Sequence, residues 1–227
     1  VAGDLECPFH GFRFAGDGAC TAIPAHPERK PPGAMRLGSF PVREAHGFVW
    51  VWTGPAEPPP EPVPFFDLEG WSWAGSGFTE SVANHHSRAV ENQLDYPHLP
   101  FVHPGTIGRV VTRDMDVTTV VDGDRIRAHI GKPEAFIELL APSIWRNKTG
   151  PAWQFLAFVP TDDQQMIYYV RTYQRMVTVP GLDWLVGTLN QLVNGVILRQ
   201  DTPLVESQPL GETRLRMGEV LVPSDGP

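Results

Sequence analysis

Two histidines, His98 and His103, lie five residues apart, directly after Pro97. Proline has no backbone N–H, so it ends or kinks the preceding helix, and the chain that follows can bring both imidazoles to one face. Two imidazoles and one carboxylate form a facial ligand set for a mononuclear non-haem iron, so a carboxylate from elsewhere in the chain would complete a site. Two alternatives stay open: a zinc hydrolase with the same ligands, and two histidines on a solvated helix end.

A second pair of candidate ligands lies near the start of the chain, in Cys7-Pro8-Phe9-His10-Gly11. A thiolate and an imidazole three residues apart on a turn can reach one metal centre, and the neighbouring proline, glycine and aromatic residues would shield it from water. A single Cys-x-x-His is weak evidence, because a buried cysteine beside an unrelated histidine is more common. In Rieske [2Fe–2S] centres, however, two loops each supply one Cys and one His.

The segment from Cys7 to Phe14 resembles the second of these Rieske loops. In that family the first loop, a Cys-x-His, lies about 15–20 residues earlier. We therefore expect it before Val1, in a part of the protein that this chain lacks. Cys20 cannot replace it, because the residue two positions later is Ala22.

The histidine pair also matches a family pattern. The α subunits of Rieske non-haem iron oxygenases carry Asn-x-x-Asp-x-x-His-x(3–5)-His, which Asn92, Asp95, His98 and His103 resemble at all four positions. The resemblance implies that the two histidines bind the mononuclear iron and that Asn92 and Asp95 serve catalysis. Asp95 would bridge His98 of one chain and His10 of the next along the path of the electrons.

The resemblance also points to the third ligand, an aspartate well downstream on a long helix. Asp201-Thr202-Pro203-Leu204-Val205-Glu206-Ser207-Gln208 is similar to the Asp-x(4)-Glu-x-Gln signature of the vanillate-demethylase-like and pheophorbide-oxygenase-like branch. We choose Asp201 as the ligand and keep Glu206 as the second candidate. Asp162 and Asp163 fit better in a turn between strands, and a solvated helix-end carboxylate remains the simple alternative for Asp201.

Membership of this family implies a terminal oxygenase. Electrons would come from a separate reductase or ferredoxin through the [2Fe–2S] cluster to a mononuclear Fe(II), where O₂ is activated to hydroxylate or O-demethylate an aromatic or other apolar organic substrate. It further implies a homotrimer, with only half of the cluster ligands in this chain. A Rieske electron-transfer protein and a metal-free helix-grip ligand-binding protein are the alternatives.

The composition excludes other partners. The formal net charge is -8, with 18 Lys and Arg against 26 Asp and Glu, so nucleic acid is not expected to bind. The longest apolar run, Phe48-Val49-Trp50-Val51-Trp52, is far shorter than the ~20 residues of a membrane helix, so no membrane association is expected. Two cysteines are too few for a disulfide-rich secreted domain, which makes the cytoplasm the expected location.

A proline-rich run between residues 55 and 64 divides the 227 residues into two expected domains. Residues 1–56 contain short β-type runs at 40–42 and 47–53, and the resemblance makes them the C-terminal part of a Rieske β-sandwich domain. Residues 57–227 would form the catalytic domain, a helix-grip (START-like) antiparallel sheet. The fold class is therefore α+β.

The second domain shows clear strand and helix patterns. Asp122-Gly123-Asp124 predicts a hairpin between strands at 117–121 and 125–130. Further strands are expected at 136–140, 153–159, 166–174 and 214–222, and helices at 87–95 and from Leu182 to Ile197. The long helix has Leu and Val opposite Asn190, Gln191 and Asn194, and it should lie across the sheet.

Several other residues have structural interpretations. His85 and His86 are expected to cap a helix and lie at the surface. His129 should face whichever side the strand register sets. Among the tryptophans, Trp145 and Trp153 are candidates for lining an apolar substrate cavity.

Overall fold

The chain divides into two compact units, Val1–Phe66 and Asp67–Pro227, in the computed structural model. The structure describes residues 3–54, 57, 65–68, 71–113, 115–149, 151–214, 217, 218, 220 and 222. The boundary expected after residue 56 lies in a proline-rich stretch that is mostly outside these residues. Each unit is described separately.

The first unit is built from short antiparallel strands. β1 (Leu5–Glu6), β2 (Arg13–Phe14) and β3 (Cys20–Ala22) form a three-stranded sheet, and β4 (Val42–Ala45) and β5 (Phe48–Val51) form a hairpin. The hairpin turn has positive φ angles at both His46 (57°) and Gly47 (73°), as a tight two-residue turn requires. The expected strand at 47–53 contains β5, whereas the one expected at 40–42 starts later, at Val42.

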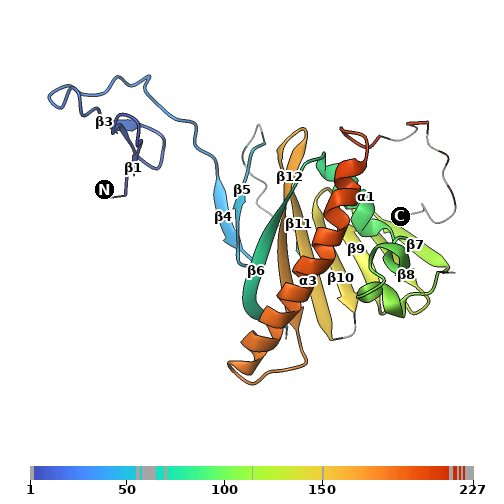
Figure 1. Ribbon diagram of the computed structural model, residues 1–227. Coiled ribbons are helices and arrows are strands. Elements are labelled where there is room, and N and C mark those ends of the chain that lie inside the picture. Colours follow the sequence, from blue (N-terminus) through green and yellow to red (C-terminus); the bar gives the residue numbers. More distant parts are fainter. Residues whose placement is uncertain are drawn as a thin grey trace. The chain divides into compact units, whose positions relative to one another are not determined.

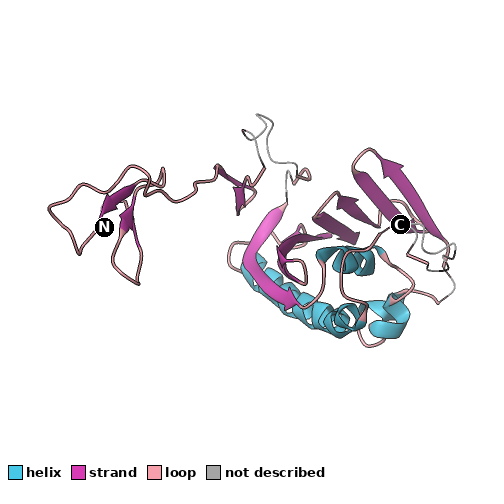
Figure 2. Ribbon diagram, turned by 90° about the horizontal axis from the view of Figure 1, so that it is seen from above, coloured by secondary structure: helices cyan, strands magenta, loops and turns pink. Residues whose placement is uncertain are grey.

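The second unit contains a seven-stranded antiparallel sheet with its helices on one side (Figures 1 and 2). The strand order is β6 (Ser72–Val82), β12 (Gln165–Gln174), β11 (Ala152–Asp162), β10 (Ile144–Thr149), β9 (Phe136–Leu140), β8 (Arg125–Ile130) and β7 (Val117–Asp122). The helices are α1 (His86–Leu94), α2 (Leu99–Val102), the 3₁₀ helix η1 (Ile107–Val110) and α3 (Leu182–Ser207). This arrangement confirms the expected antiparallel sheet with a long helix across it.

The turn and helix signals of the sequence locate most of these elements. β7 and β8 pair from Val117↔Ile130 to Asp122↔Arg125, and Gly123 takes the positive φ that the turn needs. Helix α1 ends just before Asp95, two residues ahead of Pro97, as expected. In the stretch 214–222, the described residues are not in a strand, which contradicts the expected strand there, and the rest of that stretch lies outside the described residues.

Helix α3 lies across the sheet. An amphipathic helix usually buries its apolar side, but much of the apolar side of α3 is exposed. Most of its leucines face solvent, and Leu192 is 65% exposed, whereas Leu198 is buried. The buried side carries small and polar residues: Gly195 lies beside Phe78, and the Asn194 amide donates to Thr172 Oγ1 at 2.8 Å. The 3.6-residue period is therefore present, but most of the leucines lie on the exposed side of the helix.

The face of the sheet away from α3 carries a cluster of charges. Glu138 is 1% exposed and pairs with Arg125, Arg127 and Arg146 at 3.5, 2.6 and 2.7 Å. Burial lowers the pKa of Arg146 to about 10, although the Glu138 carboxylate opposes this shift. One buried carboxylate therefore holds three guanidinium groups on the outer face.

We predict that Glu138→Gln lowers the free energy of unfolding by about 2–4 kcal/mol, because it leaves Arg146 nearly buried without its counter-charge. Urea denaturation measures the change. Glu80→Gln is the control, since its ion pair with Arg199 at 3.5 Å is mostly exposed on the arginine side and should contribute under about 1 kcal/mol. Equal small losses in both variants would contradict a stabilising role for the cluster.

Candidate metal centre

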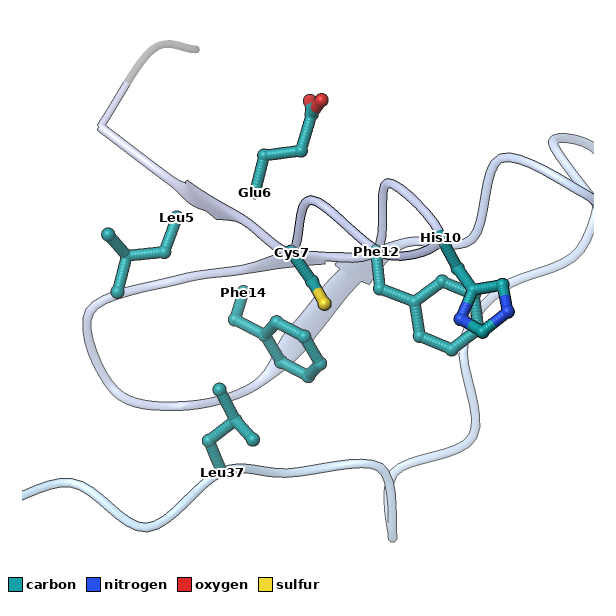
Figure 3. Close-up of a pocket in the computed structure, with 7 residues that line it drawn as sticks. All are labelled: Leu5, Glu6, Cys7, His10, Phe12, Phe14 and Leu37. Atoms are coloured by element: carbon teal, nitrogen blue, oxygen red, sulfur yellow. The ribbon is translucent and has the colours of Figure 1, made fainter.

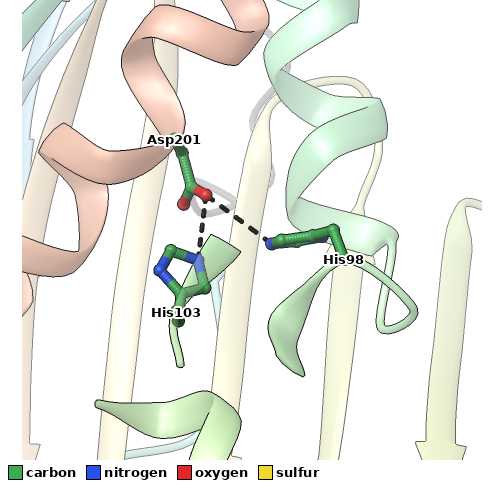
Figure 4. A group of neighbouring side chains, drawn as sticks. All are labelled: His98, His103 and Asp201. Carbon is green, nitrogen blue, oxygen red and sulfur yellow. Dashed lines mark ion pairs between the residues drawn. The ribbon is translucent and has the colours of Figure 1, made fainter. Parts of the chain in front are cut away.

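Three side chains that the sequence singles out converge in the second unit. His98, His103 and Asp201 each offer one ligand atom, and these atoms lie within 4.8 Å of one another (Figure 4). Asp201 Oδ1 is 2.9 Å from His103 Nε2 and 3.6 Å from His98 Nε2. The side chains are 15%, 1% and 4% exposed for His98, His103 and Asp201. The three groups therefore form one small, nearly buried cluster.

The two histidines are placed by a single turn of helix. His98 precedes α2 and His103 follows it, with the His103 backbone N–H donating to Leu99 at 3.0 Å. Gly108 of η1 packs tightly on this turn, since a Cβ there would lie 2.2 Å from the Leu99 carbonyl oxygen. The close packing fixes α2, and α2 in turn directs both imidazoles towards α3.

Each ligand candidate is oriented by a neighbour that occupies its other polar atom. His103 Nδ1 donates to Gln200 Oε1 at 2.8 Å, and His98 Nδ1 lies 3.3 Å from Asp95 Oδ2. These partners hold the Nδ1 protons and leave both Nε2 atoms available, as outer partners of metal-binding histidines do. Gln93 Nε2 donates weakly to Asp201 Oδ2 at 3.4 Å and leaves Oδ1 for the centre.

The polar atoms at the centre fit a bound cation. His103 Nε2 and Asp201 Oδ1 are both buried, lie 2.9 Å apart and have no other partner at the centre except His98 Nε2, which is 3.6 Å from Asp201 Oδ1. An imidazole lone pair facing a buried carboxylate is unfavourable unless a proton or a metal lies between them. Burial by itself lowers the pKa of His103, but Asp201 and Gln200 outweigh it and raise that pKa. Two nitrogens and one oxygen suit Fe(II) or Zn²⁺.

The geometry of α3 separates Asp201 from the second candidate, Glu206. Five residues along an α-helix amount to a rotation of about 140°. Glu206 accordingly points elsewhere, and its Oε1 accepts from the Ala83 backbone N–H at 2.9 Å. Glu206 therefore lies outside the cluster, and the helix itself continues past Asp201 to Ser207.

The two expected catalytic residues line a cavity beside the cluster. Asn92 and Asp95 both contribute to its wall; Asn92 Nδ2 is buried without a hydrogen bond partner, and Asp95 is 44% exposed. The cavity has about 60 Å³ open to the centres of water-sized molecules. One water needs roughly 10–15 Å³ of such space, so the cavity has room for several waters.

Of the other residues that the sequence analysis named, some lie where expected and others do not. Trp145 lines the cavity and donates to the Gln93 carbonyl at 2.9 Å, but Trp153 lies on the opposite face of the sheet and is not part of the wall. His85 caps α1 through its ring, as expected, and His86 is partly buried behind it. Gln93 and Gln200 were not predicted, because a single amide beside a ligand carries no signal of its own in one sequence.

Cys7 and His10 lie on the hairpin loop between β1 and β2, as expected (Figure 3). The loop is closed by Cys7 N–H to Phe12 O and Gly11 N–H to Cys7 O, both 2.8 Å. Gly11 has φ +71°, and a Cβ there would approach the Pro24 ring to 3.0 Å. Both candidate ligands line a surface pocket of about 440 Å³ together with apolar residues, whereas Cys20 is not part of it.

None of the helices among the described residues is long and apolar enough to span a membrane.

Known proteins resemble this chain in sequence and in fold. Residues 1–41 match the Rieske [2Fe-2S] domain, which implies an iron–sulfur cluster. The vanillate O-demethylase oxygenase subunit of Pseudomonas sp. (strain ATCC 19151) is 33% identical over 171 residues, which cover 70% of this chain and 50% of that protein. A putative toluene-4-sulfonate monooxygenase iron-sulfur subunit of Comamonas testosteroni is 39% identical over 112 residues, 46% of this chain and 30% of that protein.

Solved structures share the fold over almost the whole chain. NdmA of Pseudomonas putida CBB5 superposes with a TM-score of 0.74 at 19% identity, covering 98% of this chain and 67% of NdmA. Dicamba monooxygenase gives 0.71 at 21% identity, with coverages of 91% and 70%. The chain spans about half the length of the vanillate O-demethylase subunit that it matches. From these matches, residues 1–41 belong to a Rieske [2Fe-2S] domain, and the chain is similar to oxygenase subunits of the Rieske non-haem iron family.

Proposed function

We propose that the chain is part of the terminal oxygenase component of a Rieske-type system, with a mononuclear Fe(II) held by His98, His103 and Asp201. When bound, the iron would supply O₂ activation, with electrons delivered through the [2Fe–2S] cluster, for hydroxylation or O-demethylation of an aromatic or other apolar substrate. The observation that carries the proposal is the convergence of three ligand atoms, one each from His98, His103 and Asp201. Two of them, His103 Nε2 and Asp201 Oδ1, are buried without a hydrogen bond partner.

The chain's own residues would prepare this site before substrate arrives. Gln200 and Asp95 hold the Nδ1 protons of the two histidines, so that neither imidazole needs to change tautomer to bind metal. Trp145 and its neighbours in the cavity wall would exclude water from the reacting face. Asn92 lies on α1 and Asp95 directly follows this helix, so both side chains line the same cavity. The Asn92 amide nitrogen has no hydrogen bond partner there.

Asp95 has a second proposed role. One carboxylate oxygen faces His98, while 44% of the side chain remains exposed to other partners. We assign this exposed side to His10 of a neighbouring chain in a homotrimer, which would make Asp95 the link between the two centres. A separate reductase or ferredoxin would be the electron donor.

In the first unit, Cys7 and His10 would supply one half of the cluster ligands. The pocket they line is apolar, with Phe12, Phe14 and Leu37 in its wall, as expected around a shielded cluster. A Rieske cluster needs two Cys and two His, so Cys7 and His10 would account for two of its four ligands.

We predict that His98→Ala and Asp201→Ala each weaken binding of Co²⁺, used as a spectroscopic substitute for Fe(II), by at least about 100-fold, because each removes one of three protein ligands. Anaerobic titration of the 227-residue chain, followed by visible absorption, measures the affinity. Circular dichroism checks that the variants remain folded.

Glu206→Gln is the matched control, since it removes a carboxylate from the same helix outside the cluster. It should bind Co²⁺ like the unchanged chain. Retained binding in Asp201→Ala together with loss in Glu206→Gln would move the carboxylate ligand to Glu206 and contradict the proposed site.

A second prediction concerns Asp95→Asn in the complete oxygenase. The asparagine keeps the volume and one hydrogen bond but loses the charge that orients His98, so iron content and the cluster spectrum should change little while product formation falls about 10–100-fold. Iron analysis, cluster reduction by dithionite and single-turnover product yield measure the three quantities. Near-normal turnover would mean that electrons take a path without Asp95.

A further inference from the structure

The strands that form the cavity wall sort their charged residues onto one face. Successive side chains of a strand alternate between faces. On β8 and β10, every Arg and Lys falls on the face away from α3: Arg125 and Arg127 on β8, and Arg146 and Lys148 on β10. Arg127 and Arg146 both pair with Glu138 there. The inner face of the same strands therefore carries no cation.

The inner face carries apolar residues and two amides instead. Asn147 on β10 lies directly opposite Gln154 on β11, and both line the cavity. Ile137 and Trp145 are their neighbours on that face, and Leu198 covers them from α3. Apolar side chains beside an amide pair in one cavity wall suit a ring that carries a polar substituent.

The amide pair lies away from the metal ligands. Trp145 is close to the centre, since it donates to the Gln93 carbonyl at 2.9 Å and the Gln93 amide reaches Asp201. Asn147 is two residues further along the same face of β10, a step of about 7 Å at the usual strand rise. This spacing is about the width of one aromatic ring, so a ring beside Trp145 would present its far edge to Asn147 and Gln154.

The charges around the cavity disfavour an anionic substituent at that edge. Among the described residues that line the cavity, the ionisable ones are His98, His103, Asp95 and Asp201 together with the neutral phenol of Tyr96, and none is Lys or Arg. Asp201 offsets part of the charge of a bound metal. A carboxylate or sulfonate at the Asn147 edge would lose its hydration there with no Lys or Arg among those lining residues to pair with it and with the metal at the other end of the ring, which is costly.

We propose, on the basis of the function proposed above, that the substrate is a neutral aromatic or heteroaromatic molecule whose carbonyl, amide or hydroxyl group is bound by Asn147 and Gln154. An amide side chain offers both a donor and an acceptor, so the pair can satisfy such a group without any net charge. The preference sets this chain apart from two relatives whose names contain the anions vanillate and toluene-4-sulfonate.

Two probes of nearly equal shape test the proposal: 4-methoxybenzamide, which is neutral, and 4-methoxybenzoate, which is an anion at pH 7.5. Binding to the chain is followed by calorimetry or tryptophan fluorescence with and without Zn²⁺, so that a benzoate bound directly to the metal is recognised by its dependence on Zn²⁺; no turnover is needed. We expect the amide to bind at least about tenfold more tightly than the benzoate. Equal affinities, tighter binding of the benzoate, or no binding of either probe would overturn the proposal.

Variants of the amide pair sharpen the test. Gln154→Arg places a cation in the cavity and should reverse the preference, whereas Gln154→Leu keeps the volume and should weaken only the benzamide, by about fivefold to tenfold. The control is Lys148→Gln, which removes a cation from the outer face next to Asn147 and should leave the preference unchanged. An unchanged preference in both Gln154 variants would contradict the assignment of the subsite.

The inference about the substrate and the proposed iron site can fail independently of each other. If Asp201→Ala keeps its metal, the iron site fails, but the charge preference of the cavity can still be measured. If the ligand variants lose metal as predicted and the benzoate nevertheless binds more tightly, only the inference about the substrate fails.

Discussion

The close approach of Asp201 to His103 is the constraint on which the site depends. A carboxylate that is 4% exposed beside an imidazole that is 1% exposed needs a cation or a proton between them. The two residues come from elements about a hundred positions apart in sequence, so they meet only when α3 lies across the sheet and α2 is held against it. The fold of the second unit can therefore be understood as the scaffold that brings these two groups together.

Strand alternation gives the same sheet two different faces. Its outer face holds Glu138 among three arginines, and its inner face holds a cavity wall of apolar side chains and amides. Because the guanidinium groups lie on the outer face and are paired with Glu138, they contribute little to the electrostatic potential in the cavity. The charge at the centre therefore comes from the ligands and the metal that they would bind. The stability of the sheet and the absence of Lys and Arg among the described residues of the cavity wall thus follow from one register.

Much of the site could be predicted from the sequence because its signals are local. Pro97 with the two histidines, Asp122-Gly123 at a hairpin and the long 3.6-residue period are all readable in short windows. The choice of Asp201 rested on a family resemblance, and only the rotation along α3 explains why Glu206 lies outside the cluster.

Other features were not readable because they depend on contacts between distant elements. The inward side of α3 depends on contacts with the sheet, such as the hydrogen bond from the Asn194 amide to Thr172 Oγ1, which no periodicity reports. β10 was missed because Arg146, Asn147 and Lys148 make it polar on both faces. The strand can carry Asn147 on its inner face because that side chain lines a cavity. It can carry Arg146 and Lys148 on its outer face because Glu138 and the Trp153 ring lie beside them.

A crystal structure of the chain grown with Fe(II) or Co²⁺ under anaerobic conditions, with anomalous scattering recorded at the metal edge, is the most direct test of the metal centre. The account predicts one strong anomalous peak about 2.0–2.2 Å from Nε2 of His98, Nε2 of His103 and a carboxylate oxygen of Asp201. A peak bound by other residues, or a metal-soaked crystal in which these three side chains remain directly paired and hold no metal, would contradict it.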